Sequence, residues 1–201
     1  MIIENPAYVF YRRIKRIRFD PGQSLSAAQA IARGLRIGVF AGRRLRALPA
    51  DEVAAFLSRL KSEAYPEPLG GKDILITADT VVIADGRILG KPAGRETALD
   101  MLRSLSGRSH SVITGVTLRN GSRSRTFDSR TKVFFKQLSD EEIDYYVDRY
   151  RPYDKAGAYG IQEWIGYVAI ERIEGSFYNV MGLPVQKLLT ELEIFIELKE
   201  K

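Results

Sequence analysis

Hydrophobic side chains recur at helical spacing in two stretches of the chain. Val53, Phe56, Leu57 and Leu60 fall at i, i+3, i+4 and i+7, which predicts a helix over 51–63 with one apolar face. The same spacing predicts a second helix over 95–105, because its leucines share one side and a glycine follows as a common stop signal. These residues are Leu99, Leu102, Leu105 and Gly107.

Runs of apolar, β-branched residues predict strands. Ile74–Ile76 and Val81–Ile83 have the composition of buried strands, and Asp85–Gly86 predicts a tight hairpin turn after the second run. Two longer strands are predicted over 111–119 and 124–135. The Asn-Gly pair between these two strands is a strong hairpin signal.

The C-terminal third contains further elements. Ser139 and Glu142 form a capping-box pattern, which predicts a helix through Tyr150. A strand is predicted over 167–173, and Leu183–Pro184 should open a last helix that ends near residue 195. The alternation of strands and helices indicates the α/β class, with a mixed sheet.

The composition suits one globular domain and restricts its chemistry. The 201 residues are 45% hydrophobic, with no apolar run of about 18 residues, so we expect no membrane-spanning segment and no secretory signal. No cysteine is present, which fits a cytoplasmic protein and excludes thiolate metal sites. His110 is the single histidine, so a bound metal would need carboxylates, water and substrate phosphates, which favours Mg²⁺ or Mn²⁺.

The N-terminal part differs from the rest. Residues 11–46 hold nine arginines, one lysine and one acid, although the whole chain carries only +6. They show no sustained hydrophobic period, apart from a possible short helix over 24–32. A basic arm of this kind can bind nucleic acid. It has few aromatic side chains to stack on bases, however: only Phe19, Phe40 and one tyrosine.

Four motifs in the remaining chain can carry chemistry. Asp79, in Ala-Asp-Thr-Val-Val, ends an apolar strand run, where a carboxylate can bind a metal or accept a proton from water; a turn or cap aspartate is the alternative reading. Lys91 sits in a Gly-Lys-Pro frame and offers a fixed charge to a phosphate, or is an ordinary surface lysine. In Asp-Lys-Ala-Gly-Ala-Tyr-Gly-Ile-Gln, over 154–162, small residues allow close approach of a ligand and Gln162 can read a base edge.

The fourth motif, over 175–184, reads Gly-Ser-Phe-Tyr-Asn-Val-Met-Gly-Leu-Pro and leads into a helix N-terminus, a favourable place for an anion. Together with Leu-Ser-Gly at 105–107 and His-Ser-Val-Ile-Thr-Gly-Val at 110–116, these motifs resemble the Maf family of nucleoside triphosphate pyrophosphatases. The resemblance covers residues 48–195. The form of the 154–162 motif is similar to the dTTP/UTP branch rather than the branch that acts on methylated GTP.

The resemblance implies a role for individual residues. Asp79 matches the proton acceptor that activates water and helps to hold a divalent metal. Thr80 and Gln162 match positions linked to base selection, and Lys91 matches a phosphate-binding lysine. Lys61 aligns with another family lysine, while Asp154 and Lys155 lie beside the pocket motif, where Lys155 is expected to support substrate binding. His110 is expected to be structural.

The family resemblance also implies a fold and an assembly. It implies an elongated mixed β-sheet flanked by helices, similar to the inosine triphosphate pyrophosphatases, and commonly a homodimer. The substrate would be a nucleoside triphosphate, cut to the monophosphate and pyrophosphate. The expected organisation is an atypical basic segment over 1–47 and a Maf-like domain over 48–201.

The basic segment lacks the opening motif of the family, which reads Ile-Leu-Ala-Ser-x-Ser-Pro-Arg-Arg and contacts the triphosphate. Synonymous codons for residues 20–32, read from their second nucleotide, permit Ile-Leu-Ala-Ser-Leu-Ser-Pro-Arg-Arg-Arg-Gln-Leu-Leu. We therefore hypothesise that residues 11–47 are an out-of-frame reading of the gene. If the segment is genuine, a catalytically impaired protein or a nucleic-acid-binding regulator are the alternatives.

Overall fold

The structure is a computed structural model that describes residues 14–18, 48–70 and 73–197. The strands are β1 (Ile14–Arg18), β2 (Asp73–Ala84), β3 (Arg87–Leu89), β4 (Ser109–Arg119), β5 (Ser124–Phe135) and β6 (Ile170–Glu174). The helices are η3 (Ala50–Glu52), α2 (Val53–Glu63), α3 (Arg95–Leu105), α4 (Asp140–Tyr150), η4 (Ala156–Ala158), α5 (Trp164–Val168), α6 (Phe177–Val180) and α7 (Val185–Glu197). None of the described helices is both long and apolar enough to cross a bilayer.

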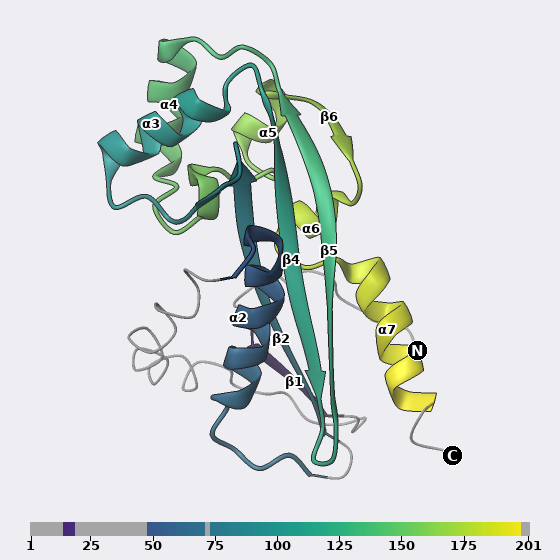
Figure 1. Cartoon of the computed structure of the whole chain (residues 1–201). Coiled ribbons are helices and arrows are strands. Elements are labelled where there is room, and N and C mark those ends of the chain that lie inside the picture. Colours follow the sequence, from purple (N-terminus) through teal and green to yellow (C-terminus); the bar gives the residue numbers. More distant parts are fainter. Residues whose placement is uncertain (1–13, 19–47, 71–72, 198–201) are drawn as a thin grey trace. The chain divides into compact units, whose positions relative to one another are not determined.

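The strands form a six-stranded sheet in the order β1-β2-β4-β5-β6, with β3 paired to β2 (Figure 1). The pairs β1–β2, β2–β3 and β5–β6 are antiparallel. The predicted α/β class, with helices flanking a sheet, is confirmed. The sequence predicted a mixed sheet, whereas these three strand pairs are antiparallel. The strands β2 and β3 run antiparallel because a hairpin turn joins them. Asp85 and Gly86, at φ 48° and 72°, form this turn as predicted.

Two compact units divide the described chain. The first holds residues up to 79, 115–127 and the C-terminal part from 188, and the second holds 80–114 and 128–187. The strands β2, β4 and β5 each contribute residues to both units.

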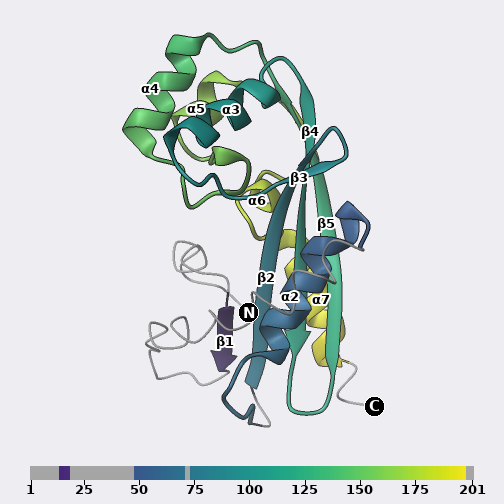
Figure 2. The same ribbon diagram turned by 60° about the vertical axis from the view of Figure 1, so that its left-hand side comes forward.

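In the first unit, helices cover both faces of the strands. Figures 1 and 2 show α2 on one face and α7 on the other. On the α2 side, a Cβ built on Gly115 of β4 would lie 2.3 Å from the carbonyl carbon of Ala54, so the helix backbone lies directly against this glycine. On the α7 side, the guanidinium of Arg123 stacks on the ring of Phe195, 4.6 Å from its centre.

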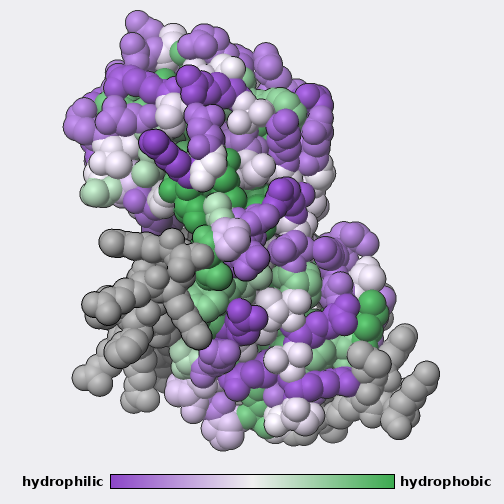
Figure 3. Space-filling view, viewed as in Figure 1, coloured by the Kyte–Doolittle hydropathy of each residue, from purple (hydrophilic) through white to green (hydrophobic). Residues whose placement is uncertain are grey.

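The second unit has its own hydrophobic core. The apolar faces of α3 and α4 meet there with η4 and the start of β4, around residues of almost no exposure. These include Leu102, Leu105, Val112, Ile143 and Tyr146. Hydrophilic side chains cover the surface over α3 and α4 (Figure 3), where Arg95 pairs with Asp144 and Asp148. Exposed pairs of this kind add little stability, so core packing holds the two helices together.

The strongest local signals predicted their elements well. The helix over 95–105 has the predicted bounds, and Gly107 follows it at φ 68°. Ser139 and Glu142 make both hydrogen bonds of the capping box. The hairpin between β4 and β5 is confirmed, but residues 120–123 form its loop, because Asn120 Oδ1 accepts from the backbone N–H groups of Ser122 and Arg123.

Three elements differ from the prediction. The two short runs at 74–76 and 81–83 are parts of one continuous strand, β2, because the polar residues between them find buried partners. The predicted strand over 167–173 is wrong at its start, since Tyr167 lies in α5 and β6 begins at Ile170. Gly166 lies within α5 and lets this helix pack against the preceding chain, because a Cβ there would meet the Ile161 carbonyl oxygen at 1.7 Å. Finally, β1 lies where no element was predicted, and the helix suggested over 24–32 lies outside the described residues.

The contact at Gly115 leads to a stability prediction. Gly115→Ala places a methyl group against the α2 backbone, which cannot give way as a flexible side chain would. We expect the free energy of unfolding, measured with urea, to fall by about 2–3 kcal/mol. Gly90→Ala is the matched control, since a Cβ there meets nothing within 4 Å. Equal stability of the two variants would contradict the predicted contact.

Candidate active site

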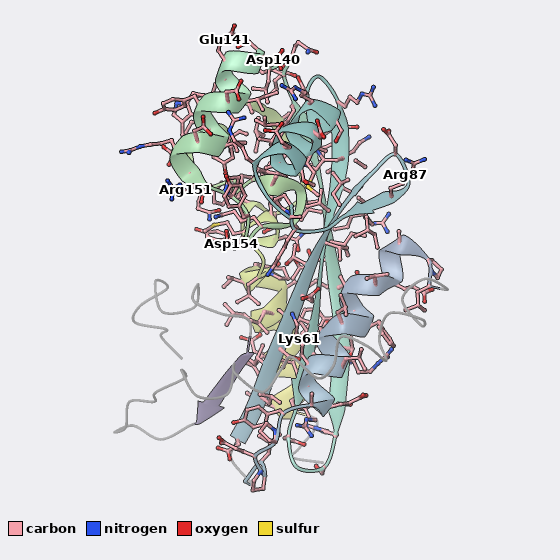
Figure 4. All side chains as sticks on the ribbon, turned by 90° about the vertical axis from the view of Figure 1, so that its left-hand side faces the viewer. Lys61, Arg87, Asp140, Glu141, Arg151 and Asp154 are labelled. Atoms are coloured by element: carbon pink, nitrogen blue, oxygen red, sulfur yellow. The ribbon has the colours of Figure 1, made fainter. Side chains whose placement is uncertain are left out.

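Asp79 and Lys61 form an ion pair in the first unit. Asp79 lies on β2 and is 8% exposed. The Nζ of Lys61, in the last turn of α2, donates to Asp79 Oδ1 and also to the Ala78 carbonyl oxygen at 3.2 Å. Figure 4 labels Lys61 where α2 passes over β2. The structure thus brings together two residues that were predicted separately as site residues.

Buried hydroxyl contacts fix α2 on the sheet and so place this pair. Thr77 Oγ1 donates to the Ser58 carbonyl oxygen at 2.7 Å, and Ser58 Oγ lies 2.9 Å from Thr117 Oγ1 on β4. Ser58 and Lys61 are one helical turn apart, while Thr77 and Asp79 are two strand positions apart, so each pair shares a face of its element. The anchored threonine and serine therefore set the register that brings the ammonium to the carboxylate.

Thr80 belongs to a buried polar network in the second unit. Its Oγ1 lies 2.9 Å from Thr114 Oγ1, which in turn donates to the carbonyl oxygen of Asn179 at 3.0 Å. The fully buried Asn179 amide donates to the Val112 carbonyl oxygen and to Thr131 Oγ1. The 175–184 motif is thereby tied to β4 and β5, and Thr80 is connected to it.

The Gly-Lys-Pro motif and the 154–162 loop meet in the second unit. The backbone N–H of Gly157 donates to the Gly90 carbonyl oxygen at 3.1 Å. Gly157 adopts φ 70°, and a Cβ there would lie 3.1 Å from Val82, so a glycine is required for both reasons. Lys91, next to Gly90, is exposed.

Lys155 is held between two carboxylates. Its Nζ lies 2.9 Å from Asp154 Oδ1 and 3.0 Å from Glu163 Oε1. Burial lowers the pKa of Lys155, but the hydrogen bonds to Asp154 and Glu163 outweigh burial and raise its pKa above the ordinary value. The pKa of Asp154 is lowered, mainly by its hydrogen bond from Lys155 and to a smaller degree by the charge of Lys91. Figure 4 labels Asp154 in the segment that follows α4.

Gln162 is exposed at the end of this loop. Its neighbour Glu163 was not singled out from the sequence, and neither was Tyr146 of α4, whose hydroxyl donates to Glu163 Oε2. Burial raises the pKa of Tyr146 well above its ordinary value, and the Glu163 carboxylate adds to this effect. A tyrosine one turn before the end of a helix carries no local signal of such a contact, so sequence reasoning could not find it.

His110 is buried among aromatic rings of the second unit. Its Nε2 lies 2.7 Å from the hydroxyl oxygen of Tyr159, and its ring meets those of Phe135 and Tyr159 edge to face. Burial lowers the pKa of His110 to about 4. A neutral, enclosed imidazole of this kind fits the expected structural role.

The described residues contain no group of three or more histidine, aspartate or glutamate side chains placed to hold a metal ion. A buried carboxylate is present at Asp79. Mg²⁺ commonly takes one or two carboxylates and completes its shell with substrate phosphates and water. Asp79 therefore fits a metal that arrives with a triphosphate, rather than a preformed protein cage.

Comparison with known proteins decides the family. A family model described as Maf-like protein matches residues 38–195. The chain belongs to the Maf family. The resemblance read from the motifs is confirmed, and the match begins ten residues before the 48–195 range that the motifs suggested.

Curated Maf relatives are close in sequence. A protein of Porphyromonas gingivalis strain ATCC 33277 is 59% identical over 152 residues, covering 75% of this chain and 76% of the relative. One of Bacteroides thetaiotaomicron is 55% identical over 149 residues, covering 72% of this chain and 77% of the relative. Both are named dTTP/UTP pyrophosphatase.

The buried histidine of this Maf chain leads to a pH prediction. The pKa of His110 is about 4 in the folded chain and 6.5 ordinarily, so between these values the unfolded chain binds a proton that the folded chain excludes. The free energy of unfolding should therefore fall as the pH drops from about 6.5 toward 4, by on the order of 3 kcal/mol from this residue.

Urea unfolding of the wild type and of His110→Gln across this range checks the pH prediction. Above pH 6.5 the wild type should be the more stable of the two, and its advantage should shrink as the pH approaches 4. An advantage that stays constant with pH would contradict it.

Proposed function

We propose that this chain hydrolyses nucleoside triphosphates to the monophosphate and pyrophosphate, with dTTP and UTP as substrates. The observation that carries the proposal is Asp79, a buried carboxylate oriented by Lys61 at the family position of the proton acceptor. The identity of 59% to a relative named dTTP/UTP pyrophosphatase supports both the reaction and the pyrimidine preference.

Asp79 would accept the proton of a water molecule as that water attacks the α-phosphorus. Lys61 supports this role because its ammonium donates to one carboxylate oxygen and so fixes the plane of the group. General-base catalysis by a positioned side chain is worth roughly 10²–10⁴-fold in rate. Pyrophosphate leaves, and the α-phosphate remains on the nucleoside as the monophosphate.

Three of the remaining predicted residues would bind substrate directly. Lys91 is exposed in a rigid Gly/Pro frame, which suits a charge for phosphate oxygens. Gln162 presents an amide to the base, and Thr80, held by Thr114, belongs with base selection. Lys155 already has two acidic partners, so its charge is compensated and a phosphate would gain little from it.

Mg²⁺ or Mn²⁺ belongs to the same proposal. Asp79 would hold the ion together with phosphate oxygens of the substrate, in keeping with the single carboxylate found there. When bound, the ion neutralises charge that builds on the phosphate oxygens. The homodimer and the cytoplasmic location suggested by the sequence stay predictions.

Residues 1–47 remain part of the proposal as an atypical segment, with 48–201 as the catalytic domain. We retain the hypothesis that residues 11–47 are read out of frame, since the permitted alternative reading of residues 20–32 contains the family's Ser-x-Ser-Pro-Arg-Arg. Sequencing the gene across this interval tests it. A clean in-frame sequence would rule the hypothesis out.

The reaction is tested by pyrophosphate release from dTTP, UTP and methylated GTP with Mg²⁺ or Mn²⁺. We expect dTTP and UTP to be cut, and Asp79→Asn to lower kcat by about 100-fold or more, because the amide cannot accept the proton. Asp85→Asn is a matched control, since Asp85 lies in the exposed turn after β2. Lys91→Met should raise KM by about tenfold.

The assays test the role of Asp79 and the effect of the N-terminal segment separately. Full activity in Asp79→Asn would remove Asp79 from the mechanism. No activity in the wild type, followed by activity in a chain with Ser-x-Ser-Pro-Arg-Arg restored, would locate the defect in the N-terminal segment. No activity in either chain would overturn the proposed function.

A further inference from the structure

Glu163 uses both of its carboxylate oxygens to join two elements of the second unit. Oε1 accepts from Lys155 Nζ at 3.0 Å, and Oε2 accepts from the hydroxyl of Tyr146. The Glu163 side chain is only 19% exposed. A carboxylate bound at both oxygens and largely shielded from water is held in one orientation, so the loop around Glu163 is fixed to α4.

Tyr146 makes this link rigid. It is fully buried in the core between α3 and α4, and the capping box at Ser139 fixes the start of its helix. Its hydroxyl also accepts from the backbone N–H of Gly160 at 3.1 Å. Both the donor and the acceptor capacity of this buried phenol are therefore used on residues 160 and 163, on either side of Gln162.

Gly160 is where three side chains of the loop converge. A Cβ built on Gly160 would lie 3.0 Å from Glu163 Cδ, 3.1 Å from Lys155 Cε and 3.2 Å from Gln162 Nε2. The Gln162 amide therefore lies over the same glycine as the Lys155–Glu163 pair. Among the described residues it makes no hydrogen bond, and it is exposed, so its donors and acceptor are available to a ligand.

The charges of the cluster indicate which part of a nucleotide it receives. Two carboxylates, Asp154 and Glu163, surround the single ammonium of Lys155, which gives these three side chains a net charge of −1. The charge of Lys155 is therefore already compensated, while the nearby ammonium of Lys91, whose charge also acts on Asp154, remains for the phosphates. The Gln162 amide offers both donors and an acceptor to a neutral base.

We propose that Glu163 is a positioning residue, which acts through Lys155 and Tyr146 to present the Gln162 amide to the pyrimidine base. This inference rests on the proposed function. It assigns Lys155 to the support of the base reader instead of to the phosphates. It also predicts that losing Glu163 weakens substrate binding and base discrimination while the chemical step continues.

The test measures kcat and KM for dTTP, UTP and GTP in Glu163→Ala, Glu163→Gln and the wild type. We expect Glu163→Ala to raise KM for dTTP and UTP by about tenfold, to change kcat less than about threefold, and to narrow the preference over GTP. Glu163→Gln should keep part of the wild-type KM, because its amide oxygen can still accept from Tyr146. Lys155→Met added to Glu163→Ala should cause little further loss, since both act through one contact.

Asp148→Asn provides the control, because Asp148 also pairs with a basic side chain, that of Arg95 at 2.7 Å, and lies on the same helix as Tyr146 outside its capping box. It should leave KM unchanged. Trp164 gives a second readout. It is the single tryptophan of the chain and directly follows Glu163, so its fluorescence should report binding of dTMP at the loop.

The outcomes separate the inference from the function it rests on. An active wild type with unchanged KM and base preference in both Glu163 variants would overturn the inference alone, as would a loss confined to kcat. If Glu163→Ala fails to fold, the isosteric Glu163→Gln decides. If neither the wild type nor the chain with Ser-x-Ser-Pro-Arg-Arg restored releases pyrophosphate, the proposed function fails. The titration of Trp164 fluorescence with dTMP then decides the inference: weaker binding in Glu163→Gln supports it, and equal or absent binding overturns it.

Discussion

The close packing of α2 on the sheet is the constraint on which the Lys61–Asp79 pair of the first unit depends. Gly115 removes the one side chain that would hold the helix away, and Ser58, Thr77 and Thr117 then fix its rotation and register through buried hydroxyls. A helix that were free to slide or turn would carry Lys61 away from Asp79. The position of the Lys61 ammonium is thus set by the polar contacts of Ser58, one helical turn earlier in α2.

In the second unit, polar contacts of the same kind restrain loops rather than a helix. Its loops carry the residues expected to meet a nucleotide, yet loops are the parts of a chain that move most. Here buried polar side chains restrain them. Asn179 ties the 175–184 motif to β4 and β5, and Tyr146 with Glu163 ties the 154–162 loop to α4. The Asn179 contacts are buried, so breaking one would leave a polar group unpaired at a cost of roughly 1–3 kcal/mol, and the Tyr146–Glu163 contact is partly buried.

The sequence predicted the features that depend on residues close together in the chain, and missed those that depend on contacts between distant residues. The capping box at Ser139 and the leucine face of 95–105 are local patterns, and both elements formed as expected. The continuity of β2 was missed because its polar residues are satisfied by partners far along the chain. The family motifs identified Asp79, Lys61 and Gln162, but not the contact between the first two. Glu163 could not be predicted because its contact is with Tyr146 of α4, which is distant in the sequence.

The Lys61–Asp79 pair has a consequence for how a charged ligand arrives. In the chain without substrate, the carboxylate already has a resident counter-ion, so a polyanion that approaches Asp79 does not meet a bare negative charge. A metal–triphosphate carries both a cation for the carboxylate and anions for the ammonium. Binding can therefore proceed as an exchange of ionic partners in which neither side chain is left alone, and the desolvation of both groups has largely been completed by folding.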